Sequence, residues 1–107
     1  MSQLPLEVLV PPVRLDTTTK DGLTQQVKQI ANQRATLVLL DLSQVQFVDS
    51  SGLGAIVAAL KSLRSAGGEL ALCQPSEQVK TLLEITGLER IMKVYPNRQA
   101  FDHEHSR

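Results

Sequence analysis

The spacing of apolar residues along this chain changes between a continuous run and a helical period, which predicts strands alternating with helices. Residues 37–42 are almost entirely apolar, as expected for a strand that is covered on both faces. Ahead of them, Leu23, Val27 and Ile30 recur at the spacing of one apolar stripe on a helix. The central part of the chain therefore begins with a helix followed by a buried strand.

A second helix and a second strand are predicted next. The helix covers residues 53 to about 66, where two glycines can form a left-handed cap. Residues 69–73 follow as a strand, with Leu70 and Leu72 on one face and Cys73 on the other. The residues expected on the inner side of the helix are Leu53, Ile56, Val57, Leu60 and Leu63.

The last third of the chain predicts two more helices around a short strand. A Pro-Ser-Glu sequence at residues 75–77 begins a helix that ends at Gly87. Residues 91–95 are expected to form a short strand, and residues 97–103 a terminal helix capped by Asn97. The apolar residues assigned to the helix after residue 77 are Val79, Leu82, Leu83 and Ile85.

The N-terminal part is β-like but interrupted. Pro11 and Pro12 divide residues 6–15, and prolines cannot donate hydrogen bonds within a sheet, which favours an edge strand or a kink between two short strands. Residues 16–19, an aspartate and three threonines, indicate a turn that leads to a helix N-cap.

This order of elements predicts an α/β fold in which residues 1–107 form a single domain. We expect a small mixed sheet of four to five strands packed by about four helices. Residues 1–10 should contain a truncated or displaced first strand, and residues 103–107 a polar tail.

The composition excludes several classes of function. Lys and Arg total 11, and Asp and Glu also total 11, so no broad cationic field is available for nucleic acid or an anionic membrane. No stretch is long enough to span a membrane, and the N-terminus lacks the pattern of a signal peptide. Cys73 is the single cysteine, so neither an internal disulfide nor a cysteine metal site is expected. These observations predict a cytoplasmic protein without a cofactor.

Residues 49–54, Asp-Ser-Ser-Gly-Leu-Gly, connect the buried strand region to the second helix. A helix N-terminus presents unpaired backbone N–H groups and a partial positive charge, which favour an anion, including one attached to a serine. Two interpretations of Ser50 are therefore open from the residues alone. Its hydroxyl either caps the helix or accepts a phosphoryl group.

This motif resembles the STAS family, and in particular its bacterial anti-sigma factor antagonists. The likeness extends to residues 67–73, to residues 79–88 and to the Leu-Asp pair at residues 15–16, and it departs at Val13, where the family commonly has glycine. The resemblance implies a STAS-type domain in which Ser50 is phosphorylated by an anti-sigma factor serine kinase and reset by a serine phosphatase. It further implies that the unphosphorylated protein, expected to be monomeric, binds the kinase and that phosphorylation releases it.

Five residues are expected to contact that partner: Asp16, Asp49, Ser51, Gly52 and Leu53. Each has a structural alternative. Asp49 could cap the helix, Asp16 could be an ordinary turn acid, and Ser51 could be a first-turn hydroxyl. Gly52 could permit close packing of a neighbouring element, and Leu53 could belong to the core.

Enzymatic interpretations are disfavoured, and we expect no catalytic residues. A nucleophilic serine requires a nearby base, whereas His103 and His105 lie in the polar C-terminal region. Ser50 lacks the hydrolase arrangement Gly-x-Ser-x-Gly, and no Walker or dinucleotide loop is present. The main alternative to the phosphorylation switch is a STAS module that binds a nucleotide or small ligand, or that scaffolds a complex, without serine phosphorylation.

Overall fold

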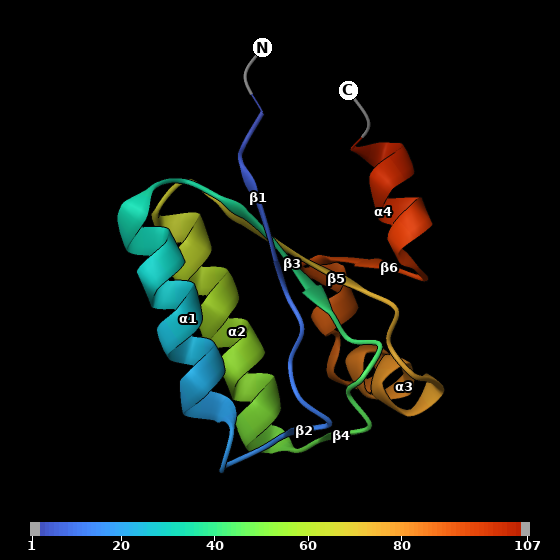
Figure 1. Ribbon diagram of the computed structural model, residues 1–107. Coiled ribbons are helices and arrows are strands. Elements are labelled where there is room, and N and C mark those ends of the chain that lie inside the picture. Colours follow the sequence, from blue (N-terminus) through green and yellow to red (C-terminus); the bar gives the residue numbers. More distant parts are fainter. Residues whose placement is uncertain (1–2, 106–107) are drawn as a thin grey trace.

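The computed structural model describes residues 3–105, which form an α/β domain (Figure 1). The expectation of a polar tail at residues 103–107 extends past this range at residues 106–107. Residues 103–104, by contrast, belong to the last helix. In chain order the elements are β1 (Leu6–Leu9), β2 (Arg14–Leu15), α1 (Lys20–Gln33), β3 (Leu37–Asp41), β4 (Phe47–Val48), α2 (Ser50–Ser65), β5 (Glu69–Cys73), α3 (Glu77–Thr86), the 3₁₀ helix η1 (Leu88–Arg90), β6 (Lys93–Tyr95) and α4 (Arg98–Glu104).

The main sheet has four strands in the order β1-β3-β5-β6, and β2 and β4 form a separate two-stranded sheet. All pairs among the described strands are parallel, so the sheet that we expected to be mixed is parallel throughout that range. The expected α/β class is confirmed. Residues 10–13 connect β1, an edge strand of the main sheet, to β2 in the other sheet, so the proline pair marks a break between two short strands.

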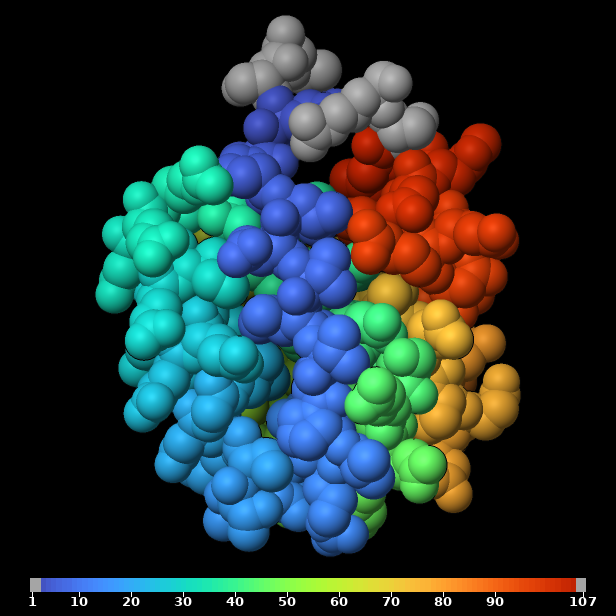
Figure 2. Space-filling model, in the orientation of Figure 1, coloured from blue at the N-terminus to red at the C-terminus, as the bar shows by residue number. Residues whose placement is uncertain are grey.

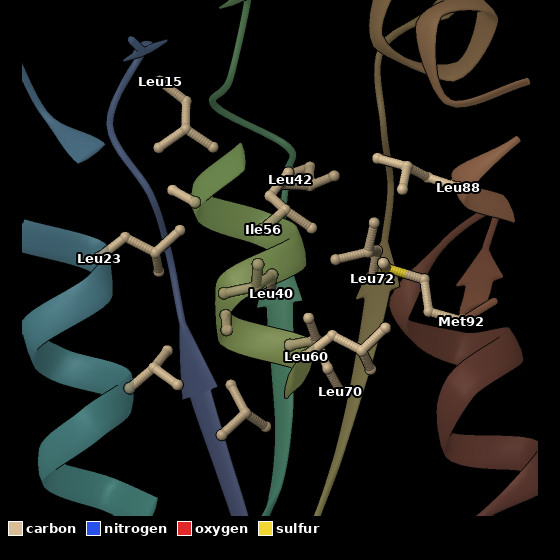
Figure 3. Close-up of a cluster of buried hydrophobic side chains, with 14 of the residues drawn as sticks. Leu15, Leu23, Leu40, Leu42, Ile56, Leu60, Leu70, Leu72, Leu88 and Met92 are labelled. Carbon is tan, nitrogen blue, oxygen red and sulfur yellow. The ribbon is translucent and has the colours of Figure 1, made fainter. Parts of the chain in front are cut away.

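The larger core lies between one face of the main sheet and helices α1, α2 and α3. Figure 1 shows α1 and α2 side by side along this face. Leu40 and Leu72 project from the sheet toward Ile56 and Leu60 of α2, as Figure 3 shows. Fully burying an aliphatic side chain of this size stabilises the fold by about 1.5–3 kcal/mol.

Helix α4 covers part of the opposite face. Its Phe101 is 1% exposed and packs edge-on against Tyr95, with ring centroids 5.4 Å apart. Leu39, Ala71 and Cys73 complete this smaller cluster. The alternation predicted for β5 is thus confirmed, since Leu70 and Leu72 belong to the larger core and Cys73 to the smaller one. Burial raises the pKa of the Cys73 thiol, consistent with a small buried apolar residue.

Most predicted helix ends are confirmed. The Ser76 hydroxyl accepts from the Val79 amide, and the Asn97 side chain accepts from the Ala100 amide. Gly87 ends α3 in the left-handed conformation, with φ 76°. Thr19 is the N-cap residue of α1, but its hydroxyl does not cap the helix, because it donates to the Arg14 carbonyl oxygen instead.

Three assignments from the sequence are corrected. Ile85 was expected on the apolar side of α3 but is 77% exposed, because it lies about 200° around the helix from Leu83. Helix α2 begins at Ser50 rather than near Leu53, since the glycines at residues 52 and 54 weaken the apolar pattern of its first turn. The last strand begins at Lys93 rather than at residue 91, because Ile91 is the C-cap of η1 and its amide donates to the Leu88 carbonyl oxygen at 3.1 Å.

Candidate functional site

The candidate site lies at the end of the parallel β2–β4 pair, where the loop after β2 and the residues that lead into α2 are neighbours. Leu15 is the register partner of Val48, and the Asp49 amide donates to the Leu15 carbonyl oxygen at 3.3 Å. In Figure 2, the blue segment that contains β2 lies beside the green segment that precedes α2. This register places Asp16, which follows β2, next to Asp49, which follows β4.

Asp49 is the N-cap of α2, so the capping interpretation of this residue is confirmed. Its Oδ1 accepts a hydrogen bond from the Gly52 amide at 3.0 Å, and its carbonyl oxygen accepts from the Leu53 amide at 3.0 Å. Ser50 is the first helical residue and is exposed. The N-cap interpretation of Ser50 is therefore wrong, and Ser50 is an exposed residue at the positive end of a 16-residue helix.

Ser51 and Gly52 connect α2 to the neighbouring loop and strand. The Ser51 hydroxyl lies 3.1 Å from the Thr17 hydroxyl, within hydrogen-bonding distance. Gly52 is buried, and a Cβ atom on it would lie 2.0 Å from the Leu15 carbonyl oxygen. Gly52 thus permits the close approach of α2 to β2, while Leu53 is half-buried against the larger core. A contact with a partner remains a prediction for all three residues.

Asp16 is only 7% exposed, and its carboxylate is held within its own loop. Its Oδ1 accepts from the Thr18 hydroxyl at 2.6 Å and from the Thr18 amide at 3.0 Å. Its Oδ2 accepts from Arg14 Nε at 3.1 Å. These bonds, led by the Thr18 hydroxyl, hold the pKa of the Asp16 carboxyl below its ordinary value against the opposing effect of burial. Asp16 is therefore an anion that shapes the loop beside Ser50.

The sequence reasoning missed an arginine–aromatic pair beside this site. Arg14 and Phe47 are register partners across β2 and β4, and the guanidinium carbon lies 4.4 Å from the ring centroid. Phe47 is 42% exposed, and the nearby Val13 is 49% exposed. The only sequence signal was the aromatic residue two positions before Asp49, and it has no periodic pattern around it.

The two histidines, His103 in α4 and His105 at its C-cap, lie outside the elements that form this site. The His105 ring stacks on Phe101 with centroids 4.2 Å apart, and its Nδ1 is 3.0 Å from the Phe101 carbonyl oxygen. Tyr95 donates a hydrogen bond to Glu104, which lowers the pKa of that carboxyl. Among residues 3–105, the acidic, histidine and cysteine side chains form no group of three that could hold a metal ion.

Two further observations concern membranes and grooves in the described range. No helix there combines the length and apolar character that crossing a membrane requires. An open groove of about 1200 Å³ lies beside α4 and is lined by residues such as Leu6, Leu37 and Tyr95. None of the predicted site residues lines it, so the groove is separate from the Ser50 site.

The fold and the Asp-Ser junction together define a STAS domain. The STAS domain family model matches residues 8–101, and the chain belongs to that family. The anti-sigma F factor antagonist of Paenibacillus polymyxa is 38% identical over 84 residues, which cover 78% of this chain and 72% of that protein.

Solved structures show the same fold. TM1081 of Thermotoga maritima matches with a TM-score of 0.85 and 34% identity over 95% of this chain and 88% of its own. The anti-sigma factor antagonist SpoIIAA in its unphosphorylated form matches with a TM-score of 0.79 and 21% identity, covering 100% of this chain and 94% of that one. Its phosphorylated form matches with a TM-score of 0.71, also at 21% identity, over 96% and 94% of the two chains.

Proposed function

We propose that this protein is an anti-sigma factor antagonist that acts by partner switching through Ser50. Unphosphorylated, it binds an anti-sigma factor that is also a serine kinase, and phosphorylation of Ser50 releases it. The observation that carries the proposal is that Ser50 is exposed at the start of α2, with Asp49 already serving as the cap. The names of the relatives support the antagonist role.

The phosphoryl group comes from ATP bound to the kinase. The Ser50 oxygen attacks the γ-phosphorus, its hydroxyl proton passes to a base on the kinase, and the bond from phosphorus to the leaving ADP oxygen breaks. A serine phosphatase resets the protein by adding water across the new bond, which returns the serine hydroxyl and inorganic phosphate. This chain supplies the acceptor oxygen and its placement and is not itself an enzyme.

Phosphorylation at this position should leave the fold intact. Ser50 is exposed, and the phosphate adds about −1.5 to −2 charges beside the positive end of α2. A nearby anion at a helix N-terminus is stabilised by about 0.3–1 kcal/mol, so the dipole favours the modified residue. The modification therefore acts on association rather than on folding.

The same charge should oppose docking. The proposed docking face comprises residues 49–53, the outer side of α2 and the loop around Asp16. Asp16 is already an anion there, and burying a second anion beside it in an interface costs several kcal/mol. Each 1.4 kcal/mol is about tenfold in affinity, so a loss of 100-fold or more, roughly, is expected. We further propose that the protein acts in the cytoplasm as a monomer.

A binding and labelling experiment with the cognate kinase tests this function. The kinase should label the wild-type protein with phosphate from ATP and should fail to label Ser50→Ala. Ser65→Ala, an exposed serine at the other end of α2, is the matched control and should be labelled normally. Undiminished labelling of Ser50→Ala, or equal affinity of the phosphorylated and unphosphorylated forms for the kinase, contradicts the proposal.

The groove beside α4 supports one alternative, a STAS module that binds a nucleotide or small ligand. Its lining combines apolar side chains such as Leu37 and Met92 with charged side chains of both signs, such as Arg90 and Glu89, a combination that suits an organic molecule with apolar and polar parts. Calorimetry with nucleotides decides between the two functions. Tight binding to the unmodified protein favours the alternative, and the switch proposal expects none.

A further inference from the structure

Arg14 makes two contacts beside the proposed phosphorylation site that the proposed function does not use. Its Nε donates to Asp16 Oδ2 at 3.1 Å, and its guanidinium carbon lies 4.4 Å from the centroid of the Phe47 ring. The Arg14 side chain is 61% exposed, so these contacts are made at the surface. A surface guanidinium held by one bond and one ring can exchange partners at small cost.

The pairing of β2 with β4 places Arg14 beside the strand that leads into Ser50 and α2. Arg14 is the register partner of Phe47, and Leu15 that of Val48. Side chains alternate along a strand, and Leu15 is fully buried, so Arg14 points to the opposite, outer face. Its bond to Asp16 directs the guanidinium along β2 toward the end of the strand pair, where α2 begins.

We propose that Arg14 is the internal cation for phosphoserine at residue 50: on phosphorylation, it leaves Asp16 and the Phe47 ring and pairs with the phosphate. This inference rests on the proposed function, since it concerns the phosphorylated state of the same serine. To the proposed function it adds a cation, Arg14, that binds the phosphate, and an aromatic surface, Phe47, that becomes uncovered when Arg14 moves.

Charge and geometry favour the exchange. A phosphate carries about −1.5 to −2 charges and three acceptor oxygens, whereas the Asp16 carboxylate carries one negative charge. Guanidinium binds phosphate through two parallel hydrogen bonds, which the present single Nε bond to Asp16 does not match. Arg14 is therefore expected to prefer the phosphate.

Asp16 can release Arg14 without losing all of its partners. Its other carboxylate oxygen keeps the hydrogen bonds from the Thr18 hydroxyl, at 2.6 Å, and the Thr18 amide, at 3.0 Å. At the ends of the elements next to this loop, the other charged groups include Asp49, which caps α2, and the Lys20–Asp21 pair at the start of α1, whose side chains are 3.9 Å apart. Arg14 can therefore leave its carboxylate partner, because Asp16 keeps the two hydrogen bonds from Thr18.

The exchange changes the surface that a partner meets. Phe47 is 42% exposed with Arg14 over its ring, and Val13 beside it is 49% exposed. When Arg14 moves to the phosphate, the ring loses its cationic cover. Phosphorylation then alters the arginine–aromatic surface as well as adding negative charge.

The experiment uses full-length protein with phosphoserine placed at residue 50 during translation, so that no kinase is needed. The second ionisation of the phosphate, with an ordinary pKa near 6, is titrated by ³¹P NMR. A neighbouring cation favours the dianion and lowers this pKa, so Arg14→Gln should raise it by roughly half to one unit. Asp16→Asn removes a neighbouring anion and should lower it. Arg98→Gln on α4, with a side chain 48% exposed, is the matched control and should leave it unchanged.

A second readout needs no variant at residue 14. In the wild-type protein, the Arg14 Nε–H signal and the Phe47 ring signals should both shift between the unphosphorylated and phosphoserine forms. Unchanged signals, or equal phosphate pKa values in Arg14→Gln and Arg98→Gln, overturn the inference. A kinase that does not modify Ser50 would refute the proposed function while leaving this titration result standing, so the two failures are distinguishable.

Discussion

Replacing Gly52 with alanine gives a sharp test of how the candidate site is assembled. An alanine Cβ at this position would lie 2.0 Å from the Leu15 carbonyl oxygen, 2.8 Å from the Leu15 carbonyl carbon and 3.1 Å from a Val48 methyl carbon. Two of these atoms are backbone, which cannot rotate away as a side chain can. The start of α2 must therefore move away from β2. This movement would lengthen or break the hydrogen bond from the Asp49 amide to the Leu15 carbonyl oxygen.

The expected magnitude follows from two opposing effects. Forcing an extra carbon into a packed site costs about 1–3 kcal/mol. Alanine is favoured over glycine within a helix by about 1 kcal/mol, which offsets part of that cost. Gly54→Ala isolates the second effect, because a Cβ at residue 54 meets nothing within 4 Å. The free energy of unfolding of Gly52→Ala should therefore lie about 1–3 kcal/mol below that of Gly54→Ala.

Urea unfolding followed by far-ultraviolet circular dichroism measures this difference. Gly54→Ala should be as stable as the wild type or more stable, and Gly52→Ala should be less stable than either. A difference of 1 kcal/mol corresponds to about 4–8 °C in melting temperature for a domain of this size. If Gly52→Ala equals Gly54→Ala in stability, the close approach of α2 to β2 is not a constraint and the reasoning fails.

Two further predictions concern stability. The pKa of Asp16 is lowered in the folded state, so its charged form stabilises the fold; this contribution to the free energy of unfolding should be complete above the unfolded pKa of about 3.9 and lost as the pH falls through the folded pKa. The urea midpoints of the wild type and Asp16→Asn should therefore converge in acid. A difference between them that stays constant with pH would contradict this. Phe101→Ala should lower the free energy of unfolding by about 3–5 kcal/mol, because its ring fills the smaller core, whereas Ile85→Ala, at an exposed position, should change it by no more than about 0.5 kcal/mol in the same assay.

The sequence by itself determined the elements whose signals are local. A buried strand shows as a continuous apolar run, and the α1 stripe shows as a helical period, because each pattern lies within one segment. Caps are local as well, since Ser76 and Asn97 bond to amides three residues ahead. The same holds for the Asp-Ser-Ser-Gly motif, since its residues are consecutive and mark a strand-to-helix junction within one segment.

Only the tertiary structure decided how that serine is surrounded. The β2–β4 pair has two residues in each strand, too few to show any period, and it is held by hydrogen bonds between distant segments. The hydroxyls of Thr17 and Ser51 meet although they are 34 residues apart. Arg14 over Phe47 and Gly52 against Leu15 arise in the same way. Such contacts depend on where two strands end in space, which no pattern within either segment specifies.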